Sequence, residues 1–346
     1  MTHNKFLIIA ILVFITASGL SFFFQTNSYF KKDNLFVEKS IKNSDNEVAV
    51  SNNLIEQTKR FFIDKKETAT SKDLSLNEIK VLFVGDIMMD RYIRKQGERF
   101  GYDFHFACAA PTFKKYDFVV ANFESTVTNY PSVSFDKTLP NYNNFKFTVD
   151  PVALVALKNA GINVVGVDNN HIYDHGKEGV DLTRQNILAR GLNYFGDPID
   201  SNYYNLRLEK NGIAFNLVSY NEFFGSVDKT LKNIEKANSN EPIIIFSHWG
   251  DEYVPTPDRV KNWAHVFIDN GADLIIGMHP HVVQETETYQ NKFIAYSLGN
   301  FLFDQYFSPE VQKGGVVEMI LNKDGIISTR FLNVSLDIER RPCIQE

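Results

Sequence analysis

Short apolar runs alternate with segments of helical periodicity along most of this chain, starting at about Lys80. The runs at 80–86 and 117–125 are short, nearly continuous and end in polar residues, which is typical of buried strands. The same pattern predicts further strands at 162–165, 213–222, 242–252, 273–281, 292–301 and 316–321.

Helices are predicted between these strands from their periodicity and end signals. The segment 150–161 has Asp150 at its start and Gly161 at its end, which are favoured residues for those positions. The segment 258–271 gathers its apolar side chains on one face, and 178–191 has a similar pattern. Alternating strands and helices predict an α/β fold, in the form of a sandwich.

The amino-terminal residues differ from the rest in hydropathy. After Lys5, residues 6–24 carry no charge, over about the length that crosses a hydrocarbon core as a helix. A cleaved signal peptide is the alternative, although no clear A-x-A site follows the run. We expect 1–25 to be a membrane anchor or signal peptide. This predicts a single-pass protein of the cell membrane, in contact with the lipid bilayer, with its catalytic domain extracytoplasmic.

Residues 26–76 have the composition of a linker. Both charge signs are mixed with many Asn and Ser residues, and no period is sustained. We therefore expect a polar tether at 26–76 and one folded domain at 77–346.

Composition and charge narrow the classes of function. Apolar residues make up 44% of the chain, which is enough for a sizeable core. The formal net charge of -6 argues against nucleic acid as a partner, because phosphate binding favours a basic surface. The two cysteines, Cys108 and Cys343, exclude a cysteine zinc cluster, and whether they pair is left open.

Polar residues of the metal-binding kinds follow the predicted strands. The densest segment is 166–176, directly after a predicted strand. In open α/β sheets, ligands bind outside the carboxyl ends of the strands. The residues that we place at strand ends in this way are Asp86, Asn122, Glu124, Asn169, Asn170, His171, His248, His279, His281 and Asn300.

These residue types indicate metal-assisted chemistry. Carboxylate, amide and imidazole groups without thiolates suit one or two divalent ions of Mn, Fe or Zn. Two such ions bridged by a carboxylate would clamp a phosphoryl group and activate water. Each residue alone also has an ordinary explanation, since Asp86 could cap a loop and His248 could be a core histidine. Their shared position favours a site.

A candidate catalytic pair lies within the densest segment. His171 could donate a proton to a leaving oxygen, and Asp174 could orient His171 through a hydrogen bond.

Several motifs, taken together, resemble the CapA family of bacterial capsule or poly-γ-glutamate synthesis proteins. The resemblance covers residues 80 to about 304 in order. The motifs are GDIMMDR (85–91), ANFEST (121–126), NNHIYDHGKEGV (169–180), HWGDEY (248–253), GMHPHVVQ (277–284) and YSLGNFLFD (296–304).

The resemblance implies a fold similar to calcineurin-like metallophosphoesterases, a β-sandwich flanked by helices. It also implies roles for individual residues. Asp86 and His281 would bind a first metal and Glu124 would bridge, while Asn170, His248 and His279 would bind a second metal. Supporting or substrate-binding roles would fall to Asn122, Asn169, Glu252 and Asn300.

Two departures from true phosphoesterases matter here. Their first motif reads D-x-H, whereas this chain has Met88 in place of the histidine, and their second motif uses Asp, whereas this chain has Glu124. We therefore expect a role in surface-polymer biosynthesis with two readings kept open. One is a metal-dependent hydrolase or transferase acting on an anionic surface polymer or its precursor. The other is a non-catalytic polymer-binding or export component that works with other membrane synthase subunits.

Overall fold

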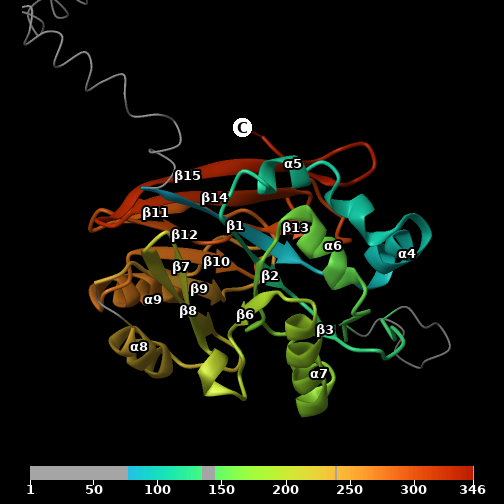
Figure 1. Ribbon diagram of the computed structural model, residues 1–346, viewed down its shortest axis with the longest axis horizontal. Helices are drawn as coiled ribbons and strands as arrows, with labels where there is room; N and C mark the ends of the chain where they lie inside the picture. The colour runs from blue at the N-terminus through green and yellow to red at the C-terminus, as the bar shows by residue number, and fades with distance from the viewer. Residues whose placement is uncertain (1–76, 135–144, 238–239, 346) are drawn as a thin grey trace, which may run out of the picture. The chain divides into compact units, whose positions relative to one another are not determined.

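The computed structural model describes residues 77–134, 145–237 and 240–345, which all belong to the unit Ser71–Glu346 of the chain (Figure 1). The expected anchor at 1–25 and linker at 26–76 lie outside the described residues. The boundaries that we expect for the three regions therefore stay predictions.

Two β-sheets form the centre of the described unit. The first sheet has the strand order β16-β15-β14-β1-β2-β5-β6, with β13 beside β1, and the second has the order β11-β12-β10-β9-β8-β7. The bounds in the first sheet are β1 Ile79–Ile87, β2 Phe118–Phe123, β5 Val164–Gly166, β6 Asn193–Phe195, β13 Asn300–Leu302, β14 Lys313–Asn322, β15 Gly325–Leu336 and β16 Pro342–Ile344. Those in the second are β7 Asn205–Lys210, β8 Ile213–Asn221, β9 Ile243–His248, β10 Leu274–Met278, β11 Thr286–Tyr289 and β12 Lys292–Ala295.

Helices and short elements complete the unit. The α-helices are α4 Arg91–Phe100, α5 Ala110–Phe113, α6 Ala153–Ala160, α7 Gly176–Ala189, α8 Val227–Lys236 and α9 Asp258–Asp269. The 3-10 helices are η1 Tyr102–Phe106 and η2 Ser201–Tyr203, and β3 Thr126–Val127 pairs with β4 Thr148–Val149.

The two sheets pack face to face through apolar side chains. Phe83 of the first sheet lies against Phe246 of the second, with ring centroids 6.4 Å apart, within one continuous buried cluster. Helices α4 to α7 contribute to a second cluster on the outer face of the first sheet. Helices α8 and α9 cover the outer face of the second sheet (Figure 1). The predicted α/β class is confirmed.

The single strand that we predicted at 292–301 is wrong. The chain forms β12 in the second sheet, turns, and then forms β13 beside β1 of the first sheet. Gly299 adopts a φ of 63° at this turn, which suits glycine because it lacks a Cβ atom. Asn300 therefore begins a strand instead of ending one, and the crossing brings it to β1.

The helix predicted at 150–161 begins later than its sequence signals suggest. Asp150 accepts a hydrogen bond from the Val152 amide, 2.8 Å away, and so closes a turn before the helix. The helix itself starts at Ala153 and ends, as predicted, at Gly161, whose φ is 113°.

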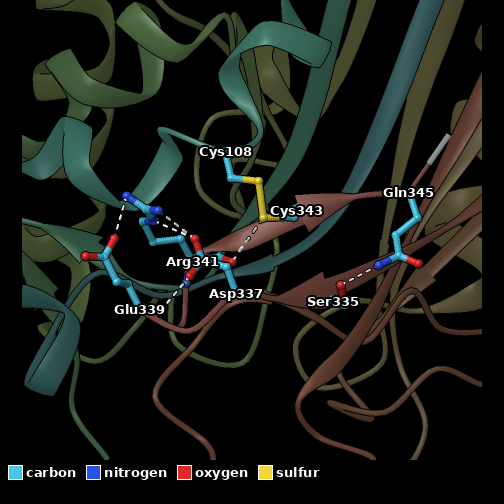
Figure 2. Close-up of a disulfide and its surroundings, with 7 residues drawn as sticks. All are labelled: Cys108, Ser335, Asp337, Glu339, Arg341, Cys343 and Gln345. Carbon is cyan, nitrogen blue, oxygen red and sulfur yellow. Dashed lines mark hydrogen bonds and ion pairs between the residues drawn. A yellow bond between two sulfur atoms is a disulfide. The ribbon is translucent and has the colours of Figure 1, made fainter.

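A disulfide joins Cys108 to Cys343 across a sequence separation of 235 residues (Figure 2). It ties the segment after η1 to β16. Nearby, Arg341 and Asp337 form an ion pair of 2.7 Å in the turn before β16. In the chain-entropy model, closing so long a loop destabilises the unfolded state by about 5 kcal/mol. The pairing that the sequence left open therefore fastens the carboxyl-terminal strand.

The expected single pass through the cell membrane is wrong for the part of the chain that the structure describes. No helix among residues 77–134, 145–237 and 240–345 is long and apolar enough to cross a membrane. The longest of these, α7, has 14 residues, whereas a crossing helix needs about 20. The apolar run at 6–24 lies outside the described residues.

Candidate metal centre

Strand ends from both sheets meet at one edge of the sandwich. Asp86 lies near the end of β1, and Glu124 directly follows β2, which runs parallel to β1. His248 ends β9, and His279 directly follows the parallel strand β10. A Cβ atom at Gly85 would lie 2.2 Å from the Gly299 carbonyl oxygen, so glycine is needed for this close approach of the chain.

The first set of side chains is Asp86, Glu124 and His281, which we call the open group. All three are buried, and their ligand atoms lie within 4.8 Å of one another. His281 Nδ1 lies 3.4 Å from Asp86 Oδ2, and His281 Nε2 lies 3.7 Å from Glu124 Oε1. This buried Asp-Glu-His group could bind a metal ion.

Glu124 shows most clearly that the open group suits a cation. Its Oε1 is buried without a hydrogen-bond partner among the described residues. Burial, and then the nearby Asp86 carboxylate, raise the pKa of Glu124 well above its usual range. An unpartnered buried oxygen of this kind is costly unless a proton or a metal ion occupies it.

The ring of His281 is fixed by a neighbour from β13. Its Nδ1 lies 2.9 Å from Asn300 Oδ1, an atom that can only accept a hydrogen bond. The proton therefore belongs on Nδ1, and the lone pair of Nε2 faces Glu124. Histidine metal ligands are commonly oriented in this way by a hydrogen bond on the other nitrogen.

The second set is Asn170, His248 and His279, which we call the closed group. His248 Nε2 lies 3.0 Å from Asn170 Oδ1 and 3.2 Å from His279 Nδ1. Burial, followed by the neighbouring His279, lowers the pKa of His248 well below its usual range. Burial also lowers the pKa of His279 to about 4. These shifts favour the neutral form of both imidazoles, and His248 Nε2 already has partners in Asn170 Oδ1 and His279 Nδ1.

Asn122 connects the two groups. Its Nδ2 donates to Asp86 Oδ1 at 2.7 Å and approaches His248 Nδ1 at 3.4 Å. Asn169 in turn donates to Asn122 Oδ1 at 3.3 Å and to the Phe123 carbonyl at 2.9 Å. The amide side chains therefore hold the ligand-type residues in fixed positions.

The pair predicted at 171 and 174 lies beside the open group. His171 Nδ1 is 2.8 Å from Asp174 Oδ2, and Nε2 is 3.8 Å from Glu124 Oε1. Asp174 is fixed by the Phe147 amide, which donates to it at 2.6 Å. The His171 ring also lies against the Phe147 ring, with centroids 4.2 Å apart. His171 is therefore held with one nitrogen toward the open group.

Two histidines of the site have backbone conformations that residues other than glycine rarely adopt. His279 has a φ of 96° and His281 a φ of 59°. Left-handed conformations of this kind cost about 1–3 kcal/mol and concentrate at functional sites. Although only Pro280 separates them, His279 contacts His248 in the closed group and His281 contacts Asp86 in the open group.

Two further acidic residues, Glu252 and Asp168, belong to neither the open group nor the closed group. Glu252 is exposed and lines a cavity beside the ligand-type residues. Asp168, which lies in the segment 166–176, is buried and accepts hydrogen bonds from Ser219 at 2.7 Å and Asn221 at 3.0 Å. Burial raises the pKa of Asp168 to about 6.

Sequence reasoning missed Arg91, whose guanidinium lies over the rings of Phe147 and Phe303 at 4.9 and 5.5 Å and lines the same cavity. Its place inside the GDIMMDR motif was the available signal.

Comparison with known proteins identifies the family. Residues 80–305 match the model for the bacterial capsule synthesis protein PGA_cap. The chain belongs to this family. Its PGA_cap region contains the open group, the closed group and the His171–Asp174 pair.

Two curated relatives agree with this assignment. The PGA biosynthesis protein CapA of Bacillus subtilis is 32% identical over 79% of this chain and 75% of its own length. The capsule biosynthesis protein CapA of Bacillus anthracis is 31% identical over 66% of this chain and 60% of its own length. The resemblance to CapA proteins expected from the motifs is confirmed.

A solved structure is more distantly similar. Vacuolar Protein Sorting 29 from Cryptosporidium parvum aligns with 78% of this chain and 97% of its own, at 13% identity and a TM-score of 0.30. This likeness is too weak to bear on the fold or the function.

Proposed function

We propose that this protein acts in the biosynthesis of a capsule or poly-γ-glutamate-type surface polymer, as a metal-dependent hydrolase or transferase of the phosphoesterase type. The names of its PGA_cap relatives support the process. We take the two-sheet sandwich to be of the metallophosphoesterase kind. The observation that carries the proposed chemistry is the buried, unpartnered Glu124 Oε1 beside Asp86 and His281.

The residues of the site divide the proposed work among them. Asp86, Glu124 and His281 would hold one divalent ion, with Mn, Fe and Zn all compatible with an N/O ligand set. When bound, such an ion polarises a phosphoryl oxygen and supplies a nucleophilic water at neutral pH. Asn170, His248 and His279 would hold a second ion.

Proton transfer falls to the His171–Asp174 pair in this proposal. Asp174 fixes the Nδ1 proton and the ring orientation of His171 at 2.8 Å. His171 Nε2 is then the atom that gives a proton to the leaving oxygen as the bond to phosphorus breaks. The ring contact with Phe147 limits rotation and so keeps Nε2 near the open group.

A second candidate, the non-catalytic polymer-binding component, is favoured by Met88. This residue is buried with Phe147 and Phe303, and its sulfur lies 3.1 Å from the Asp90 amide nitrogen. A methionine packed in this way supplies no imidazole to the open group. In this alternative, the site would bind an anionic polymer without turnover, within a larger synthase complex.

Metal analysis and turnover of the full chain separate the two candidates. The purified protein is loaded with Mn²⁺, and its hydrolysis of bis(4-nitrophenyl) phosphate and of γ-linked glutamate oligomers is measured. The hydrolase proposal predicts bound metal, and turnover that His171→Ala lowers at least about 100-fold while the metal is retained. Bound metal with no turnover of any phosphoester or polymer would favour the binding component.

A further inference from the structure

A cavity of about 350 Å³ lies beside the open group. Its lining comes from distant parts of the chain and combines the metal site with side chains that no proposed step uses. The lining includes Arg91, Phe147, His171, Glu252, His281 and Phe303. The volume lies at the lower end of the range for small-molecule sites, which suits one small unit of a ligand.

Arg91 is the permanent cation among these lining residues. Its side chain is 12% exposed, and its Nη2 pairs with Asp304. Its Nε is buried without a hydrogen-bond partner among the described residues. Since an arginine offers five N–H donors, the pairing with Asp304 leaves donors for a ligand.

The guanidinium is also held in place before any ligand arrives. It lies over the Phe147 ring at 4.9 Å and the Phe303 ring at 5.5 Å. The Arg91 backbone has a φ of 52°, and its amide donates to Asp90 Oδ1 at 2.8 Å. A planar guanidinium fixed against aromatic rings recognises a carboxylate with little loss of side-chain entropy.

Glu252 gives the cavity a second charge of opposite sign. Although Arg91 is paired with Asp304, its remaining N–H groups can donate to a carboxylate, and Glu252 can accept from an ammonium group, so the two side chains together suit a zwitterionic unit. Because Glu252 is exposed to solvent, its contribution to the binding free energy should be smaller than that of Arg91.

We propose that this cavity binds the amino-terminal unit of the substrate polymer, which in a γ-linked chain is the unit with a free ammonium group, with its α-carboxylate on Arg91 and its ammonium group facing Glu252. The proposal rests on the proposed function, because it identifies the part of a glutamate polymer that lies beside the metal site. Arg91 is then a binding residue that selects the substrate.

Calorimetric titration of the full chain with γ-linked triglutamate tests this assignment, with and without Mn²⁺. The test variant is Arg91→Gln with Asp304→Asn, which removes both partners and leaves no unpaired buried carboxylate. Arg94→Gln is the control, since Arg94 lies on the same helix with a side chain 16% exposed and is absent from the cavity lining. Thermal melts establish that each variant is folded.

The double variant should bind triglutamate about 10- to 100-fold more weakly, the loss expected when charge-assisted hydrogen bonds are removed. Arg94→Gln should bind as the unaltered protein does. N-acetylation of the triglutamate should weaken binding a few-fold, and Glu252→Gln should erase that difference.

A change below about twofold in the double variant, or an equal loss in Arg94→Gln, would overturn the proposal. A loss seen for inorganic phosphate but not for triglutamate would overturn it as well. Because the readout is affinity, Arg91-dependent binding without any turnover would leave the proposal standing while the hydrolase proposal fails.

Discussion

The open and closed groups lie side by side and use similar side chains, yet their polar atoms are satisfied in opposite ways. In the closed group, Asn170, His248 and His279 are bonded to one another. In the open group, Glu124 keeps a buried oxygen without a partner. A metal entering the closed group must replace existing hydrogen bonds, whereas one entering the open group satisfies an atom that is costly to leave alone.

The two halves of one site therefore need not bind metal ions with equal affinity. The open group brings two carboxylates and an imidazole, and the closed group brings only neutral ligands. Coulomb attraction for a divalent ion is therefore stronger in the open group. We infer that a first ion binds there and that a second ion binds more weakly.

The largest effect is expected from Glu124→Gln, which removes the charge and the unpartnered oxygen of the open group. Removing an outer-shell partner costs roughly 10- to 100-fold in metal affinity, and a direct ligand should cost more than that. Turnover should be lost with the metal. Titration with Mn²⁺ followed by elemental analysis provides the measurement.

The matched control for this prediction is Asp197→Asn. Asp197 is equally buried but pairs with Arg184 away from both groups. Equal metal affinity in Glu124→Gln and the unaltered protein would show that the open group is not a metal site.

The next largest effect is expected from His171→Ala. The substitution should lower turnover roughly 10²- to 10⁴-fold, the range for a lost general acid or base. Metal content should stay unchanged, because His171 Nε2 is 3.8 Å from Glu124 and is not one of the two groups. Asp174→Asn should lower turnover less than His171→Ala does. Loss of metal in His171→Ala would show that His171 is a metal ligand.

A smaller effect on metal affinity is expected from Asn170→Asp. This substitution gives the closed group a negative charge and so tests whether charge explains the difference between the two groups. The added carboxylate should attract a second ion, so the affinity for that ion should rise about tenfold, or 1.4 kcal/mol. Competition experiments at two metal equivalents measure the change. An unchanged second affinity would mean that charge does not explain the difference between the groups.

The smallest effect concerns acid stability and uses a histidine outside both groups. His105 is buried, its Nε2 lies 3.0 Å from the Ile93 carbonyl, and burial lowers its pKa to about 4. Its folded pKa lies below the unfolded value of about 6.5. The neutral, buried His105 therefore makes its full contribution to the free energy of unfolding above pH 6.5. As the pH falls from 6.5 through 4, protonation of the unfolded state removes that contribution.

The His105→Gln variant should lack this part of the acid response. The unaltered protein should lose about 3 kcal/mol more than the variant between pH 7 and 4. Urea unfolding at several pH values, with and without Mn²⁺, measures how the free energy of unfolding of each protein changes with pH. Parallel slopes would show that His105 is not held neutral, and a metal-dependent difference would tie it to the site.

The sequence predicted the position of the site better than its internal organisation. Apolar runs located β1, β9 and β10, and the rule for strand ends then located Asp86, His248 and His279. The run at 292–301 failed because its two strands are equally apolar and only Gly299 marks the crossing between sheets.

Contacts between distant residues were beyond what the sequence could give. The family resemblance grouped Asn170 with His248, but no spacing reveals the hydrogen bond between them, or that Arg91 lies over the rings of Phe147 and Phe303, because these contacts depend on packing across the fold. The Cys108–Cys343 pairing was open for the same reason.

A crystal structure of the full chain with Mn²⁺ and an anomalous difference map would test the inequality of the two groups most directly. The account predicts the strongest peak among Asp86, Glu124 and His281, and a weaker one among Asn170, His248 and His279 that grows with metal concentration. A peak confined to the closed group, or none at the open group in saturating Mn²⁺, would contradict it.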